Sequence, residues 1–138
     1  FIPLFAAHLY LTNFRGGLVI SDNEVAVSQL GVPETLIEQH GMISAEVVER
    51  MARGALTRFD TDLALATVGL ARPPETEEKP VGLVYVALAW KKGARSKSYN
   101  WLASPAEIQS RTAKMALNLL RHHLRSLDPK PRDDPAPA

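Results

Sequence analysis

The sequence of 138 residues contains no cysteine. A chain without cysteine cannot form a disulfide framework, a thiolate metal site, an iron–sulfur cluster or a cysteine nucleophile, so its fold must rest on its hydrophobic core. Proteins of the cytoplasm are rarely held by disulfides, and we therefore expect a cytoplasmic location.

An excess of charge of one sign is also missing, because 16 Lys and Arg residues oppose 15 Asp and Glu residues, for a formal net charge of +1. A balanced chain carries no overall field that would hold a polyanion, and we expect no nucleic-acid partner. Long apolar runs are absent too. The longest, Val81 to Trp90, is ten residues long, whereas about 20 are needed to span a bilayer, so we expect no membrane partner.

The remaining composition is that of an ordinary globular protein, with 46% apolar and 22% charged residues. A chain of this length predicts one compact domain, which we place over residues 1–127. Residues 128–138 contain four prolines and little that could be buried. They predict a disordered tail.

The first part of the chain has the periodicity of helices. Apolar residues three and four apart predict a helix over Phe1 to Asn13, and Leu18 to Ile20 is a short run typical of a strand. Ser21, with Glu24 three residues later, has the spacing of a capping box, so a helix should follow and end before Gly31.

Two more helices are expected directly afterwards. Pro33 opens the first of them, and Gly41 ends it. Ser44 caps a longer helix that runs to about Phe59. The inner face of this helix is an apolar stripe with helical spacing, formed by Val47, Val48, Met51, Ala55 and Leu56.

Strands follow in the next segment. Leu63 to Leu70 and Val81 to Trp90 are near-continuous apolar runs, the pattern of central strands that are covered on both faces. Ser96 to Leu102 is more polar and predicts an edge strand. Residues 72–80 contain three prolines and several charges, so they predict an exposed loop.

The last helix has the clearest start signal. Ser104, Pro105 and Glu107 combine a cap, a proline in the first turn and a capping-box glutamate, which predict a helix from Pro105 to Ser126. The full order is helix, strand, three helices, three strands and helix. It predicts the α/β class, as a three-layer α/β/α arrangement with a mixed sheet.

Several of these stretches, taken in order, resemble the CinA C-terminal domain family, the bacterial nicotinamide-nucleotide amidohydrolases. The resemblance covers Phe14 to Leu124, with one residue fewer in the proline-rich loop. The stretches that carry it are Phe14-Arg15-Gly16-Gly17-Leu18-Val19, Asn23-Glu24, Leu30-Gly31-Val32-Pro33-Glu34-Thr35-Leu36, His40-Gly41-Met42-Ile43-Ser44-Ala45-Glu46-Val47, Gly54-Ala55, Asp62-Leu63-Ala64, Gly69-Leu70-Ala71 and Glu77-Glu78-Lys79-Pro80-Val81-Gly82-Leu83-Val84-Tyr85-Val86-Ala87.

The resemblance implies a three-layer α/β fold and hydrolysis of the amide of nicotinamide mononucleotide to the acid and ammonia, without a metal or another cofactor. Nicotinamide mononucleotide or a related nucleotide is then the implied small-molecule partner. The four histidines agree with the absence of a metal, because no two of them have a spacing that would turn both toward one ion on a helix.

The residues that would perform this chemistry are altered in the sequence. The family's opening strand and its Ala-Glu-Ser-Cys-Thr-Gly-Gly turn have no counterpart, and its Pro-Gly-Ser-Ser falls on residues 8–11. The family's Tyr and Lys after the next strand correspond to Ser21 and Ala26. Its Thr is displaced by one residue to Thr67, and its Arg before the last helix corresponds to Pro105. We therefore expect an impaired or inactive amidohydrolase.

Six residues remain as candidates for a site. The hydroxyls of Ser21 and Thr67 are weak candidates for catalysis. The candidates for substrate binding are Asn23, Gly69, Lys79 and Gly82. Each has a structural explanation as well, since the asparagine can cap a helix, the lysine can mark the start of a strand and glycines serve turns or close packing.

Three functions of different classes stay open at this point: a residual amidohydrolase, a nucleotide-binding module without turnover, and a structural domain that meets a second copy of itself. We interpret two basic clusters as solvated surfaces rather than as an anion or RNA site, because one complements a helix dipole and the other protects a strand edge. These clusters are Arg121, His122, His123 and Arg125, and Lys91, Lys92, Arg95 and Lys97.

Overall fold

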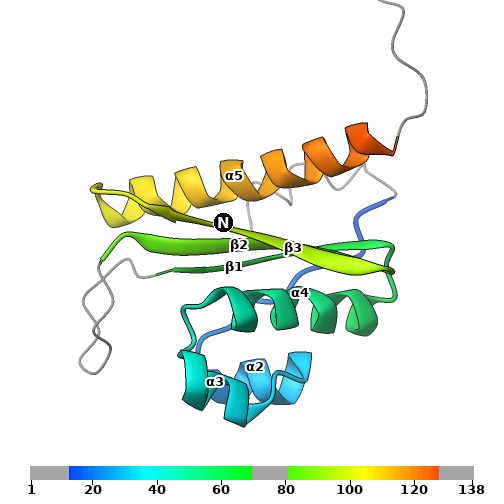
Figure 1. Ribbon diagram of the computed structural model, residues 1–138, viewed down its shortest axis with the longest axis horizontal. Coiled ribbons are helices and arrows are strands. Elements are labelled where there is room, and N and C mark those ends of the chain that lie inside the picture. Colours follow the sequence, from blue (N-terminus) through cyan, green and yellow to red (C-terminus); the bar gives the residue numbers. More distant parts are fainter. Residues whose placement is uncertain (1–12, 70–80, 128–138) are drawn as a thin grey trace, which may run out of the picture.

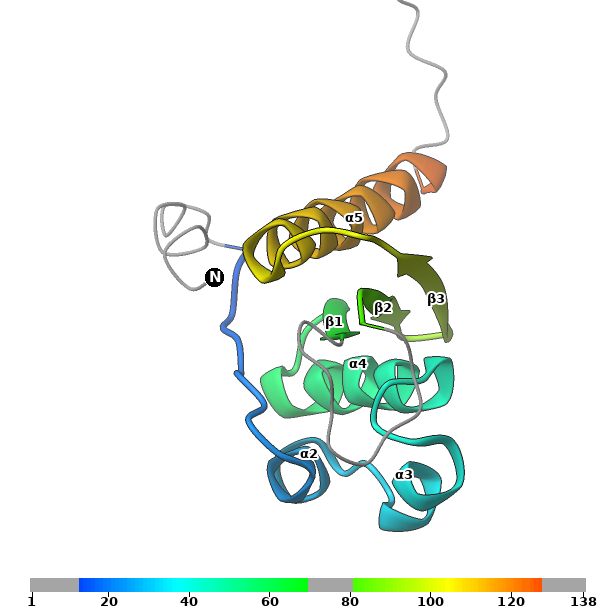
Figure 2. The ribbon, with the colours of Figure 1, turned by 90° about the vertical axis from the view of Figure 1, so that its left-hand side faces the viewer.

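The structure is a computed structural model that describes residues 13–69 and 81–127. Within these ranges four helices surround a three-stranded sheet (Figure 1). Helix α5 covers one face of the sheet and α4 covers the other, while α2 and α3 lie beyond α4 (Figure 2). The elements are α2 (Asn23–Leu30), α3 (Glu34–His40), α4 (Ala45–Phe59), β1 (Leu63–Gly69), β2 (Leu83–Trp90), β3 (Gly93–Asn100) and α5 (Pro105–Ser126).

The sheet has the order β1-β2-β3, and both pairs of strands are antiparallel. The predicted α/β class with helices on both faces is confirmed, but the prediction of a mixed sheet is wrong for the described residues. A turn of two residues, Lys91 and Lys92, joins β2 to β3 and can only connect antiparallel neighbours. Strand β2 is central as predicted, whereas β1 lies at an edge of the described sheet.

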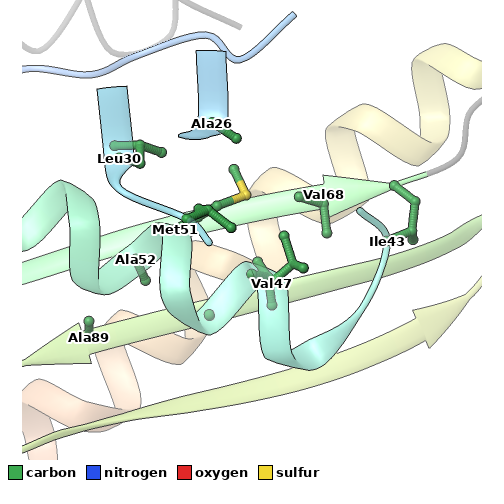
Figure 3. Packing of buried hydrophobic residues seen from close by; sticks show 11 residues of the cluster. Ala26, Leu30, Ile43, Val47, Met51, Ala52, Val68 and Ala89 are labelled. Atoms are coloured by element: carbon green, nitrogen blue, oxygen red, sulfur yellow. The ribbon is translucent and has the colours of Figure 1, made fainter. Parts of the chain in front are cut away.

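Strand β2 is apolar throughout because both of its faces are covered. Val86 and Leu88 pack into a cluster with Ala116 and Leu119 of α5. The alternate residues Ala87 and Ala89 point to the opposite face and pack in the cluster that includes α4 (Ala89 is labelled in Figure 3). A strand with two buried faces loses the alternation of polar and apolar residues, which explains the continuous run in the sequence.

The N-cap of helix α2 lies one residue later than predicted. The side chain of Asp22 accepts a hydrogen bond from the backbone N–H of Val25, at 2.9 Å, and serves as the N-cap. The prediction that Ser21 caps this helix is therefore wrong, because Asp22 stands directly before the first helical residue. Gly31 ends the helix as predicted, in a left-handed conformation with φ of 66°.

The caps predicted for the two long helices are confirmed. The hydroxyl of Ser44 accepts a hydrogen bond from the N–H of Val47 and donates one to the carbonyl oxygen of Gly41, at 3.3 and 2.8 Å. At the start of α5, Ser104 and Glu107 form the predicted capping box. Local capping signals thus place the starts of both helices that cover the sheet.

Part of the N-terminal prediction is not met. The prediction of a strand at Leu18 to Ile20 is wrong, since residues 14–21 form neither helix nor strand and Val19 is 68% exposed. None of the described strands pairs with this segment, and an apolar run needs a neighbouring ladder to become a strand. The predicted first helix, the loop at 72–80 and the tail at 128–138 lie outside the described residues.

None of the helices in the described ranges is both long and apolar enough to cross a bilayer. The longest described helix, α5, carries four Lys or Arg residues. Such a helix is amphipathic, with one apolar stripe, and its buried side is the one that meets the sheet.

Gly54 lets α2 lie directly on α4. A Cβ atom at this position would stand 2.0 Å from the carbonyl oxygen of Leu30, which is a backbone atom at the end of α2. Neighbouring Ala26 and Ala52 are fully buried in the same interface. Close approach of the two helices therefore depends on a position without a side chain.

We predict that Gly54→Ala destabilises the protein although alanine is the better helix former. Alanine gains about 1 kcal/mol in helix propensity, but the overpacking against the Leu30 backbone costs about 3 kcal/mol, for a net loss of about 2 kcal/mol. Urea unfolding followed by circular dichroism measures the change. Gly17→Ala is the matched control, because no atom lies within 4 Å of the Cβ that it adds. Equal stability of the two variants would contradict the packing argument.

Candidate functional site

The structure brings three of the candidate site residues, Thr67, Gly69 and Gly82, to one end of the sheet, where β1 ends and β2 begins. This end also holds the starts of α4 and α5 and is the left-hand end in Figure 1. Ile43, just before α4, lies beside Val68 of β1 in Figure 3. Gly69 is the last residue of β1, and Gly82 directly precedes β2. A site that uses the predicted glycines must therefore be formed here.

Gly82 is required by backbone packing. Its φ is +93°, and a Cβ atom there would stand 1.9 Å from the carbonyl oxygen of Trp101. The N–H of Trp101 donates a hydrogen bond to the carbonyl oxygen of Gly82 at 3.0 Å. The glycine thus allows the residue before β2 to contact the backbone that follows β3. This close packing is sufficient to explain why the position holds a glycine.

Gly69 has a similar role on the neighbouring strand. It pairs with Val84 of β2, and an added Cβ atom would stand 2.5 Å from a methyl group of that valine. The structure therefore brings Gly69 and Gly82 to the same end of the sheet, but both positions are explained by packing. Lys79, the charged member of the predicted set, lies outside the described residues.

The hydroxyl of Thr67 points to the α5 side of the sheet. Thr67 pairs with Val86, whose side chain belongs to the cluster under α5. The next residue, Val68, points to the α4 side and is buried in the other cluster (Figure 3). The buried Val68 therefore occupies the position directly before the strand's glycine, where the resemblance implies the hydroxyl of a threonine.

Ser21 lies on the other side of the molecule from the Thr67 hydroxyl. It is exposed, it precedes α2, and its side chain has no hydrogen-bond partner among the described residues. Asn23 is the first residue of α2 and is exposed as well, while Asp22 supplies the cap. Because α2 lies beyond α4, the sheet separates the two candidate hydroxyls. They do not form one catalytic arrangement.

Ala26 occupies the position that corresponds to the family's lysine. It is fully buried between α2 and α4, among Leu30, Met51 and Ala52 (Figure 3). An alanine there neither accepts a proton nor pairs with an anion. Pro105, which corresponds to the family's arginine, likewise has a structural role, as the first residue of α5.

The described residues include few groups that could activate a hydroxyl or hold an ion. No set of three His, Asp or Glu side chains that could bind a metal occurs among them. His40 and Glu46 approach to 3.7 Å, but both side chains are more than one third exposed. Such a surface ion pair contributes little and defines no pocket.

Sequence reasoning missed one polar contact between the layers. The hydroxyl of Ser96 on β3 donates a hydrogen bond to a carboxylate oxygen of Glu49 on α4, at 2.6 Å. The two residues are 47 positions apart, and no local signal in the sequence links them. The contact ties the edge strand to α4, and it lies away from the end of the sheet where the candidates gather.

Comparison with known proteins gives a consistent match. A family model described as the CinA C-terminal domain matches residues 10–124. The CinA-like protein of Geobacter sulfurreducens is 44% identical over 112 residues, which are 80% of this chain and 27% of that protein. The CinA-like protein of Geotalea daltonii is 42% identical over 112 residues, with the same coverage. The chain thus spans about a quarter of the length of these curated relatives.

Solved structures have the same arrangement of helices and strands. The competence damage-inducible protein A (ComA) from Klebsiella pneumoniae superimposes with a TM-score of 0.82 at 23% identity, covering 91% of this chain and 81% of that one. The competence/damage inducible protein CihA from Agrobacterium tumefaciens gives a TM-score of 0.72 at 31% identity, covering 77% and 66%.

We predict that Ala26→Lys destabilises the fold. A lysine at this fully buried position would place a charge with no partner in the interface between α2 and α4, which costs about 3 kcal/mol of unfolding free energy. Ser28→Lys, at an exposed position of the same helix, is the control and should change stability by about 0.5 kcal/mol at most. Urea unfolding of both variants makes the comparison, and a stable Ala26→Lys variant would contradict it.

Proposed function

This chain belongs to the CinA C-terminal domain family, and from that membership we propose that it is a member which keeps the family scaffold and has lost amidohydrolase activity. The family resemblance supplies the reaction, hydrolysis of the amide of nicotinamide mononucleotide. The observation that supports the loss is the residue at position 26, a fully buried alanine without a proton-accepting atom where the resemblance implies a lysine. Because the chain spans a quarter of its relatives, the proposal concerns this domain alone.

Amide hydrolysis needs a hydroxyl or water nucleophile, a base within hydrogen-bond distance of it, and donors for the oxyanion. Thr67 lies on the α5 side of the sheet and has no basic hydrogen-bond partner among the described residues. Ser21 is exposed to solvent and equally without such a partner. A hydroxyl at its ordinary pKa is a weak nucleophile unless a base activates it. These two residues therefore support no turnover by themselves.

The test is the production of ammonia and nicotinic-acid mononucleotide from nicotinamide mononucleotide by the purified chain. We expect no turnover above the rate without protein, from a sample whose circular dichroism shows a folded protein. A CinA-like relative that is active under the same conditions serves as the positive control. Turnover at an ordinary enzymatic rate, with a kcat of about 1 per second or more, would overturn the proposal.

A domain without turnover can still bind a nucleotide, and thermal unfolding separates this possibility from a structural role. A ligand that binds only the native state at about 100 times its Kd raises stability by about 2.7 kcal/mol and shifts the Tm by several degrees. Because packing explains Gly69 and Gly82, we expect no shift with nicotinamide mononucleotide. A shift of that size would favour a retained nucleotide site.

A structural role that brings together two copies of the chain is favoured by one observation. Leu117 and Leu124 of α5 and Leu127 directly after it are 36%, 49% and 62% exposed. Exposed apolar residues that cluster on one surface mark contact sites more often than single ones do. Light scattering after gel filtration gives the mass in solution. A dimer mass supports this role, and a monomer at high concentration removes it.

A further inference from the structure

Charge is distributed unevenly along the chain although its total is balanced. Residues 91–127 contain eight Lys or Arg residues and one acidic residue, Glu107, a formal net charge of +7. Residues 13–69 contain four Lys or Arg residues and eight acidic residues, a net charge of −4. The expectation that no nucleic acid binds is based on the total of +1 and on the interpretation of the two basic clusters as solvated surfaces. That total says nothing about a local surface.

The fold places these two segments on different sides of the molecule. Residues 91–127 form β3 and α5, whereas residues 13–69 include α2, α3 and α4 (Figure 2). Arg95 and Lys97 of β3 pair with Leu88 and Val86 of β2, whose side chains pack under α5. The two cations therefore point to the α5 side of the sheet, and both are exposed.

The basic residues of α5 lie on the flank next to β3 and on the outer surface of the helix. Viewed from its start, as in Figure 2, a right-handed helix turns clockwise as it recedes, and β3 lies to the right. Arg111 precedes the buried Thr112 by one position, so it turns toward β3. Leu117 and Leu124 each follow a buried residue and turn toward β1 instead. The same spacing places Lys114, Arg121, His122 and Arg125 between the β3 side and the outer surface.

Two aromatic rings lie next to these cations. The rings of Tyr99 and Trp101 stack with their centroids 5.0 Å apart and an angle of 15° between their planes. Tyr99 pairs with Val84, so it lies on the same face of the sheet as Arg95 and Lys97. Helix α5 packs on β2 and β1 rather than over β3, and both rings are half-buried.

We propose that this basic face, formed by Arg95, Lys97, Tyr99, Trp101, Arg111 and Arg125, binds single-stranded nucleic acid. Cations in a row can follow a phosphate backbone, and aromatic side chains provide a surface on which unpaired bases stack. Alternate residues of a strand are about 6.8 Å apart, so Arg95, Lys97 and Tyr99 of β3 form one line, which Trp101 continues directly after the strand. The paired aromatic rings favour a nucleic acid over an acidic protein, which offers no bases to stack.

The first experiment measures the fluorescence anisotropy of a labelled oligothymidylate of about 16 nucleotides against the full chain in about 50 mM salt. We expect saturable binding. With four phosphate contacts, raising the salt from about 50 to about 200 mM should weaken the affinity about 50-fold. The absence of binding in low salt would overturn the proposal.

A charge-reversal pair locates the binding surface. Arg95→Glu combined with Lys97→Glu should weaken binding at least about tenfold, because two attractive contacts become repulsive. The control combines Arg53→Glu with Arg58→Glu on α4, which changes the net charge equally on the opposite side of the sheet. All four residues are exposed, so both variants should fold. An equal loss in the control would overturn the assignment to this face.

The aromatic contribution is tested separately. Trp101→Ala should weaken binding about tenfold, whereas Trp101→Phe, which keeps a ring, should retain most of the affinity. In a Trp90→Phe background, quenching of the remaining tryptophan by the oligonucleotide reports stacking directly. If double-stranded DNA or polyglutamate bound as tightly as the single strand, or if quenching were absent, the face would be a general anion or protein contact and the proposal would be wrong.

Discussion

Burial of both faces of β2 is the constraint on which the rest of the structure depends. Val86 and Leu88 fill the space under α5, and Ala87 and Ala89 on the other face are small enough for α4 to lie close to the strand. All four residues are fully buried. Because both faces of β2 must be covered, the chain supplies one helix before the three strands, α4, and one after them, α5. The layered arrangement follows from this one strand.

The parts of the fold that could be predicted are those with local signals. Ser44 and Ser104 start α4 and α5 where their sequences indicate, and Gly31 ends α2, since each of these signals acts within one helical turn. The predictions of a strand at Leu18 to Ile20 and of a mixed sheet are wrong, because no local signal determines which segments pair. Strand pairing depends on neighbours that are distant in the sequence, and an apolar run alone does not specify which strand it will pair with.

The candidate site shows the same division between local and distant information. Alternation along β1 predicts that Thr67 and Val68 face opposite sides, and the pairing with β2 confirms which side each one takes. Whether Gly69 and Gly82 hold a ligand or allow close packing could not be predicted, because the neighbouring atoms, a methyl group of Val84 and the backbone of Trp101, come from other segments. The separation of Ser21 from Thr67 likewise follows only from the placement of α2 beyond α4.

Chain order and layering together explain why the net charge is a poor guide to the surface. The acidic first segment supplies the helices on the α4 side, and the basic last segment supplies β3 and α5, so a difference along the sequence becomes a difference across the sheet. The sheet keeps the two charged surfaces apart, and salt screens exposed charges beyond about 8 Å. A ligand near β3 therefore meets the local charge of +7 much more than the total of +1. A domain without amidohydrolase activity would still carry the four cations of this surface, because all four are exposed and lie outside both core clusters.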